Sequence, residues 1–402
     1  MTYKKAYRPY LMKDVRDASA LAKFTVASMF ANIGGSSIGY RLAGGRVVLA
    51  NEFAAEAACT YSANFPDTIV DTRDILDIVD TPAAIDGFLA KAGLKRGDLD
   101  VLDGSSPCTE FSTAGSGVSD NGGTASLIFH FCHMARTVMP KVVIGENVSA
   151  LAKWDKYRPI LKAALDTLRY AGNPSRRLYY VYFVILSAAD FGVPQARERV
   201  FYIAVRKDVA EAIGIHSDAE ILNLFPEPTH PDPSTHVNIR TGLAGLQQTE
   251  SEIRPWLRAA LVNKVGSIIR QLPRQPEKPT KPKHVGLDTK TWFTLTRCSW
   301  DHPVPTLTAM GQQPNGLSGA VHPAEDRKFT VKEQMRLHGM PDDFQFPFPV
   351  TVAQASDRMG NMVPPLLMKA IADSIYEKVL RSCAELWRRP SNLSRSRRAV
   401  AS

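Results

Sequence analysis

One stretch near the amino terminus constrains the fold more than any other part of the sequence. Residues 24–30 have the composition of a short buried strand, and the Gly34-Gly35 pair predicts a tight turn that opens a short helix. A second strand is expected at 46–49, and Glu52 lies just beyond its end. Strand, glycine turn, helix, strand and acid form the βαβ unit of dinucleotide-type folds. We therefore expect a nucleoside cofactor, because the glycines let the backbone approach a ligand and the acid can bind ribose hydroxyls.

Apolar runs continue to alternate with helical periods as far as residue 206. This alternation predicts an α/β fold built from βαβ units. We expect helices over 53–64, 81–97, 125–138 and 157–171, and strands over 99–102, 141–145, 179–186 and 200–205.

The strand at 99–102 delivers a Pro-Cys pair into a loop at its carboxyl end, which is where ligands bind in open α/β sheets. Pro107 fixes its own φ and favours an extended Ser106, so Cys108 is held stiffly. A thiol presented in this way suits a nucleophile, although a lone cysteine is more often a small hydrophobe of the core. The glycine- and serine-rich segment 112–124 follows at once and has the composition of a closing loop.

Bulk composition narrows the class of protein. The 402 residues carry a net charge of +9, which favours a polyanionic partner. The five cysteines are scattered without a C-x-x-C pair, so neither a disulfide framework nor a metal site is indicated. No apolar run has membrane-spanning length, and residues 1–16 lack the apolar core expected of a signal peptide. We expect a cytoplasmic, nucleoid-associated protein.

The chain outside the βαβ region is less regular. Residues 1–20 show no clear periodicity and are expected to be a polar lead-in. Prolines become frequent after about residue 207 and the βαβ pattern disappears, which predicts a second, loop-rich and basic domain. Thr330 and Glu333 form a capping box that opens a helix through Leu337, and an amphipathic helix over 366–380 is expected to return to the first domain. The predicted segments are 1–206 (catalytic), 207–350 (second domain), 351–382 (returning segment) and 383–402 (basic tail).

Two basic features suit contact with a polyanion. Strand periodicity would place Gln195, Arg197 and Arg199 on one face, either as a reading surface or as a solvated edge. A run of lysines and arginines interleaved with prolines covers 264–290 and could neutralise phosphates. The tail arginines could add affinity or form a disordered, solubilising tail. The candidate contacts in the run are Lys264, Arg270, Arg274, Lys278, Lys281 and Lys283.

Seven short motifs follow one another in an order and spacing that resemble the DNA (cytosine-5)-methyltransferase family of bacterial or phage restriction-modification systems. The resemblance covers residues 23–378 apart from 207–300, the position of the target-recognition domain in that family. The motifs are Phe30-x₃-Gly34-Gly35, Asn51-Glu52, Pro107-Cys108-x₂-Phe111-Ser112, Glu146-Asn147-Val148, Gln195-x-Arg197-x-Arg199, Arg336-Leu337-x-Gly339 and Gly360-Asn361-x-Val363-Pro364.

This resemblance implies a mixed sheet with helices on both faces, a smaller target-recognition domain and S-adenosylmethionine as the methyl donor. Phe30 would pack on the adenine, Glu52 would bind the ribose, and Gly34-Gly35 would approach the methionine end. Asp74 and Ile75 would meet the adenine edge, although Asp74 also suits a helix N-cap. The other implied pocket residues are Asn32, Ile33, Phe53, Pro107, Leu127, Asn361 and Met362. Two positions depart from the family: Ser28 stands where Asp is usual, and Asn32 where Gly is usual.

The resemblance also implies a covalent mechanism. Carbon 5 of cytosine is a poor nucleophile until a thiolate adds at carbon 6, and Cys108 would supply that thiolate. Glu146, protonated, would hold N3 and the exocyclic amine, while Arg199, with Arg197 as a second candidate, would bind O2. The target base would be flipped out of double-stranded DNA, with the loop from Ser112 closing over it. We expect a monomer, with a cognate restriction endonuclease as a functional partner.

Other functions remain open at this point. A tRNA cytosine-5 methyltransferase of the same fold would keep the chemistry and change the substrate. An amino-methyltransferase would need a Pro-Pro-aromatic signature and no thiol, and Ser106-Pro107-Cys108 argues against it. A catalytically silent DNA-binding regulator is disfavoured by the joint presence of Cys108, Glu146 and Arg199.

Overall fold

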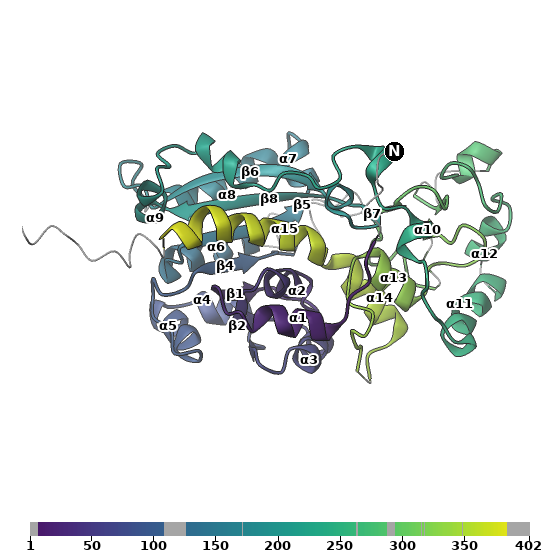
Figure 1. The fold of residues 1–402 in the computed structure, drawn as a ribbon, viewed down its shortest axis with the longest axis horizontal. Helices are drawn as coiled ribbons and strands as arrows, with labels where there is room; N and C mark the ends of the chain where they lie inside the picture. Colours follow the sequence, from purple (N-terminus) through teal and green to yellow (C-terminus); the bar gives the residue numbers. More distant parts are fainter. Residues whose placement is uncertain are drawn as a thin grey trace, which may run out of the picture.

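The computed structural model describes residues 7–107, 126–170, 172–262, 264–287, 294–314, 316, 318–347 and 349–383. In this part of the chain a seven-stranded sheet forms the larger body, and a smaller lobe lies beside it, at the end opposite α9 (Lys207–Ala212) (Figure 1). The lobe contains α10 (Ile239–Gly242), α11 (Glu250–Val262) and α12 (Lys264–Ile269). No helix within the described residues is long and apolar enough to cross a membrane.

The strand order of the large sheet is β3-β2-β1-β4-β5-β8-β6, and only β8 runs antiparallel to its neighbours. The order reverses between β1 and β4, so their carboxyl ends open the crevice in which doubly wound sheets bind ligands. The strands are β1 (Thr25–Met29), β2 (Arg46–Asn51), β3 (Ile69–Asp71), β4 (Val101–Gly104), β5 (Val142–Val148), β6 (Tyr179–Ser187) and β8 (Glu198–Arg206).

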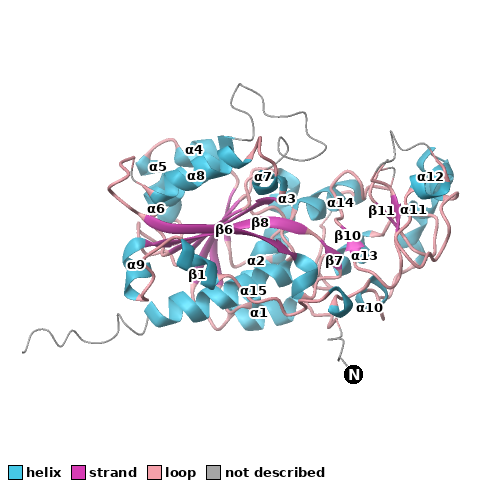
Figure 2. Cartoon of the chain, turned by 90° about the horizontal axis from the view of Figure 1, so that it is seen from above, coloured by secondary structure: helices cyan, strands magenta, loops and turns pink. Residues whose placement is uncertain are grey.

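Helices cover both faces of this sheet, as the sequence predicts (Figure 2). One face carries α4 (Ile75–Val79), α5 (Pro82–Ala90), α6 (Leu127–Val138) and α8 (Arg158–Arg169). The other carries α2 (Gly35–Leu42), α9 and α15 (Pro365–Ile375), which a π turn extends through Tyr376–Leu380. The helices α3 (Ala55–Asn64) and α7 (Ala150–Lys153) complete this body. The amphipathic C-terminal helix therefore does return to the first domain.

The amino-terminal lead-in is the clearest error of the sequence prediction. Residues 12–19 form α1 (Met12–Ser19), which packs on α2 and buries Met12, Val15 and Ser19. These three positions lie on one helical face at spacings of three and four. With only two apolar residues on that face, the stripe is too short to stand out as a period in the sequence.

The part of the chain between residue 225 and α13 (Val331–Leu337), called the second region below, is built from short elements rather than a large sheet; it includes the lobe. Its small parallel pairings are β7 (Gln195–Ala196) with β10 (Val304–Pro305) and β9 (Thr296–Arg297) with β11 (Ala320–Val321). The helices α13 and α14 (Val352–Asn361) lie between this region and the sheet (Figures 1 and 2). Short 3₁₀ helices lie in this region at Pro233–Thr235 and Pro282–Val285. Two others, Ala188–Phe191 and Ala219–Leu224, belong to the larger body.

Packing does not change at the predicted boundary after residue 206. Val209, Ile221 and Phe225 belong to the same apolar core as the sheet face under α15. The hydroxyl of Ser374 on α15 also donates to the carbonyl of Leu224 at 2.8 Å. Residues 207–225 therefore pack with the larger body, and the predicted boundary cuts through its core.

Candidate active site

The turn after β1 has an unusual backbone. Phe30, Asn32 and Gly34 all have positive φ, at 53°, 49° and 93°. Two non-glycine residues in the left-handed region store strain, and such strain is concentrated at functional sites. A Cβ on Gly35 would lie 2.3 Å from the carbonyl oxygen of Val363, so the turn is held tightly against the carboxyl-terminal segment.

Glu52 holds this turn from the end of β2. Its two carboxylate oxygens accept hydrogen bonds from the backbone N–H groups of Asn32 and Ala54, each at 2.8 Å. The next side chain, Phe53, is 68% exposed and presents a bare aromatic ring beside the turn. An anchored acid and an exposed ring at the sheet's carboxyl edge suit the ribose and base of a nucleoside.

The remaining predicted cofactor residues differ in their contacts and in how deeply they are buried. Met362 lies against Gly35, and the side-chain amide of Asn32 donates to the carbonyl of Arg358 at 2.8 Å, so residues far apart in sequence meet at the turn. Asp74 caps α4, with its carboxylate accepting from Leu76 N–H at 2.9 Å, which is the structural role that the sequence left open. Ile33 and Ile75 are buried, Leu127 is half-buried, and Pro107 and Asn361 are exposed.

The loop that carries the predicted nucleophile is described only up to Pro107. Cys108 and Ser112 lie outside the described residues. The amide of Asn147, at the end of β5, donates to the carbonyl of Ser106 at 3.2 Å and so fixes the start of the loop. The sequence contains Asn147 within a motif, but nothing in that pattern assigned it this role.

Glu146 and Arg199 form a buried ion pair next to this loop. Arg199 Nε lies 3.0 Å from Glu146 Oε1, and Glu146 is 7% exposed. The antiparallel pairing of β5 with β8 brings the two residues together. Val148 lies opposite Arg199, and Glu146, two residues earlier on β5, is on the same face of the sheet. Burial raises the pKa of Glu146 above its ordinary value, and the positive charges of Arg199 and Arg197 oppose that shift.

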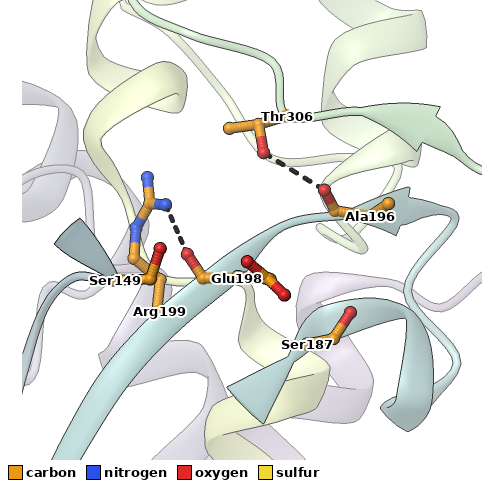
Figure 3. A pocket seen from close by; sticks show the side chains of 6 residues that line it. All are labelled: Ser149, Ser187, Ala196, Glu198, Arg199 and Thr306. Carbon is orange, nitrogen blue, oxygen red and sulfur yellow. Dashed lines mark hydrogen bonds between the residues drawn. The ribbon is translucent and has the colours of Figure 1, made fainter. Parts of the chain in front are cut away.

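A cavity of about 300 Å³ opens at this sheet edge (Figure 3). Arg199 lines it and donates to the carbonyl of Glu198 at 2.7 Å, while the hydroxyl of Thr306 donates to the carbonyl of Ala196 at 3.1 Å. Thr306 comes from the second region, so the cavity lies where that region meets the sheet. Its lining residues are Ser149, Ser187, Ala196, Glu198, Arg199 and Thr306.

The predicted reading surface of Gln195, Arg197 and Arg199 is wrong in one respect. Gln195 and Arg197 are 0% and 1% exposed. Arg197 donates to the carbonyls of Leu307 at 3.2 Å and Gly360 at 2.9 Å, and the Gln195 carbonyl oxygen accepts from Leu307 N–H at 3.1 Å. Both side chains therefore fasten the second region to the sheet, and only Arg199 reaches the cavity.

The predicted basic run lies in the lobe with α11 and α12, away from the cavity. Arg274 is exposed and forms an ion pair with Asp326, which Arg297 also binds. Lys281 is half-buried. The other four candidates are exposed: Lys264, Arg270, Lys278 and Lys283.

Comparison with known proteins identifies the chain. A family model described as C-5 cytosine-specific DNA methylase matches residues 24–377. The chain belongs to this family. It is a DNA cytosine-5 methyltransferase.

Relatives agree with the assignment over most of the chain. The Type II methyltransferase M.Eco47II from Escherichia coli is 31% identical over 358 residues, covering 88% of this chain and 78% of the relative. The Type II methyltransferase M.PspPI from Psychrobacter sp. is 29% identical over 361 residues, covering 88% and 79%.

Solved structures match the fold of this methyltransferase. A prophage-encoded protein from E. coli aligns with a TM-score of 0.62 at 21% identity, covering 89% of this chain and 99% of that protein. The Dnmt2 methyltransferase of S. pombe aligns with a TM-score of 0.57 at 17% identity, covering 88% and 97%.

Proposed function

We propose that this methyltransferase transfers the methyl group of S-adenosylmethionine to carbon 5 of a cytosine within a short double-stranded DNA sequence. The observation that carries the proposal is the buried Glu146–Arg199 pair beside a cavity at the carboxyl edge of the sheet. A carboxyl and a guanidinium held together at a largely buried site can bind the N3 and O2 edge of one pyrimidine.

The residues around the glycine turn fit the cofactor. Glu52 uses one lone pair on each oxygen for the backbone and keeps others for ribose hydroxyls. Phe30 and the exposed Phe53 offer aromatic faces to an adenine, and Asn361 and Met362 would close the pocket from the other side. When bound, S-adenosylmethionine would supply an electrophilic methyl group on a sulfonium.

The reaction follows from covalent catalysis at Cys108. The thiolate sulfur forms a bond to carbon 6, the electrons of the 5,6 double bond move to carbon 5, and Glu146 donates its proton toward N3. Carbon 5 then takes the methyl group, whose bond to the donor sulfur would break with its electron pair left on that sulfur. A base removes the proton from carbon 5, the double bond re-forms, the thiolate leaves and the N3 proton returns to Glu146. Glu146 must be protonated for this sequence, and the burial that raises its pKa favours that state.

Access to the base requires flipping, because the target lies inside the duplex stack. The second region, which meets the sheet at Thr306, would read the sequence, and the exposed lysines beyond α12 would neutralise phosphates. The two relatives named above are Type II methyltransferases, which supports a role in restriction-modification. We infer a monomeric enzyme whose functional partner is a restriction endonuclease that cleaves the unmethylated sequence.

Bisulfite sequencing of DNA from cells that express the protein tests this proposal. The wild type should protect one cytosine within a short recurring motif, and Cys108→Ser should protect none. Both proteins should bind S-adenosylmethionine equally, because Cys108 is not required for that step. A folded wild type that binds the cofactor and leaves DNA unmodified would overturn the DNA assignment and direct the assay to RNA. Protection by Cys108→Ser would overturn the covalent mechanism.

A further inference from the structure

A buried carboxyl lies at the switch point of the sheet without an assigned role. Asp103 is paired in register with Ser28 on the neighbouring strand, each one residue before its strand ends. The chain leaves β1 for the glycine turn and leaves β4 for the loop that carries Cys108. Asp103 therefore lies between the two segments that must bring the methyl group and the nucleophile together.

The surroundings of Asp103 are polar but contain no partner cation among the described residues. The carboxyl group is 1% exposed. One of its oxygens accepts from the hydroxyl of Ser28 at 2.8 Å and the other from the hydroxyl of Tyr40 at 3.1 Å. A buried carboxylate with hydroxyl donors and no counter-ion is costly, so it either takes up a proton or awaits a positive charge.

Charge balance favours the second possibility at a site for S-adenosylmethionine. The sulfonium and the α-ammonium of that molecule are both positive. The side chain of Ser36, in the first turn of α2 after the glycine turn, also hydrogen-bonds Asp103. The family usually carries its acid at the position of Ser28, and here the acid is directly across the strand pair instead. Resting on the function proposed above, we propose that Asp103 is a positioning residue whose carboxylate balances the positive charge of S-adenosylmethionine at the methyl-transfer end of the pocket.

Titration of this group makes the proposal testable. Burial raises the pKa of Asp103 to about 7, and the hydroxyls of Ser28 and Tyr40 limit that rise. The other titratable groups that interact with it are Tyr40, Glu146, Tyr61 and Tyr202. Burial raises the pKa of Tyr61 to about 12 and the pKa of Tyr40 and Tyr202 well above the ordinary tyrosine value. The tyrosines therefore stay neutral near pH 7, where Asp103 changes its charge.

The sign of the effect follows from linkage. A positive ligand prefers the ionised carboxyl, so below the pKa its binding must first expel a proton. We expect the affinity of the DNA-free enzyme for S-adenosylmethionine to fall by up to about tenfold per pH unit as pH drops below about 7. Asp103→Asn keeps the shape and removes the charge, so its affinity should be lower above pH 7 and should vary by less than about twofold from about pH 6 to about pH 8.

Three controls separate a charge effect from a merely structural one. Glu146→Gln should retain the pH dependence, because the titration belongs to Asp103. Ser28→Ala removes a donor that lowers the pKa of Asp103, so the pH profile should move to higher pH. S-adenosylhomocysteine lacks the sulfonium, so the preference for S-adenosylmethionine over it should shrink in Asp103→Asn by on the order of tenfold.

Isothermal titration calorimetry across pH, with circular dichroism to verify folding, distinguishes the outcomes. If the wild type binds no S-adenosylmethionine, the proposed function itself fails. If the wild type binds it, but Asp103→Asn has the same pH profile and the same preference over S-adenosylhomocysteine, only the role of Asp103 is overturned. If Asp103→Asn does not fold, the profile of Ser28→Ala decides: a shift to higher pH supports the proposal, and an unchanged profile overturns it.

Discussion

At the scale of single residues, the two arginines of one motif have different partners, so substituting one or the other should have different effects. Arg197 is buried and donates to the carbonyls of Leu307 and Gly360, whereas Arg199 meets Glu146 at the cavity. Arg197→Met should lower the free energy of unfolding by about 2 kcal/mol, because two buried carbonyls lose charged donors. Arg199→Met should reduce kcat on the order of a hundredfold, a loss of about 2.7 kcal/mol in the transition state.

Urea denaturation and single-turnover methyl transfer measure the two effects separately. Arg197→Lys is the matched control, since it keeps the charge but cannot direct two hydrogen bonds to separate carbonyls. A large loss of kcat in Arg197→Met with unchanged stability would place that residue in the catalytic site after all.

The same pair shows where residue-level prediction from the sequence stops. Motif order was sufficient to predict that Glu146 and Arg199 share one site, because both lie on regular strands of one sheet. Period-two alternation did hold at Gln195, Arg197 and Arg199, because the residues between them are exposed. It did not show that this side of the chain packs under the second region, which buries Gln195 and Arg197. The pairing of Ser28 with Asp103 depends on the register of two strands 75 residues apart in sequence, which no local pattern contains.

At the scale of elements, the contact between α2 and α15 should tolerate little added volume. A Cβ on Gly39 would lie 2.6 Å from Met368 Cβ and 2.7 Å from the carbonyl of Pro365. Gly39→Ala should therefore lower the free energy of unfolding by about 1–3 kcal/mol, because the two helices must separate. Gly87 on α5 is exposed and has nothing within 4 Å of its would-be Cβ.

Gly87→Ala is thus the matched control, and it should raise stability by about 0.5–1 kcal/mol through helix propensity alone. Chemical denaturation followed by circular dichroism gives both values. Equal shifts in the two variants would mean that the α2–α15 contact is looser than the structure has it.

Element prediction succeeded where the pattern was long and local. The helices α6, α8 and α13 and six strands of the large sheet lie close to where the sequence predicts them, whereas β3 was not predicted. The helix α1 and the small sheets of the second region were missed, because short elements owe their existence to the surfaces on which they pack. The Thr330–Glu333 capping box is the exception in the second half, since its signal is contained in four residues.

At the scale of the whole molecule, the net charge of +9 should act through particular lysines of the lobe. Lys278 and Lys283 are exposed there, whereas nearby Arg274 is already paired with Asp326. If each lysine meets one phosphate, the double variant Lys278→Gln/Lys283→Gln should reduce the slope of log Kd against log salt by about 1.8. Fluorescence anisotropy measures that slope. The enzyme is titrated into a labelled duplex that contains its target sequence, and the titration is repeated at several potassium chloride concentrations.

The control removes the same charge from the catalytic body. Lys95 and Lys162 are exposed, and Lys95 precedes β4 at the amino edge of the sheet, opposite the cavity. Lys95→Gln/Lys162→Gln should leave the slope nearly unchanged, because charges far from the duplex are screened beyond about 8–10 Å. Equal slope changes in both double variants would attribute the effect to net charge, and no change in either would remove Lys278 and Lys283 from the DNA interface. A change confined to the lobe would mean that the lobe holds the duplex by its phosphates while the cavity acts on the base.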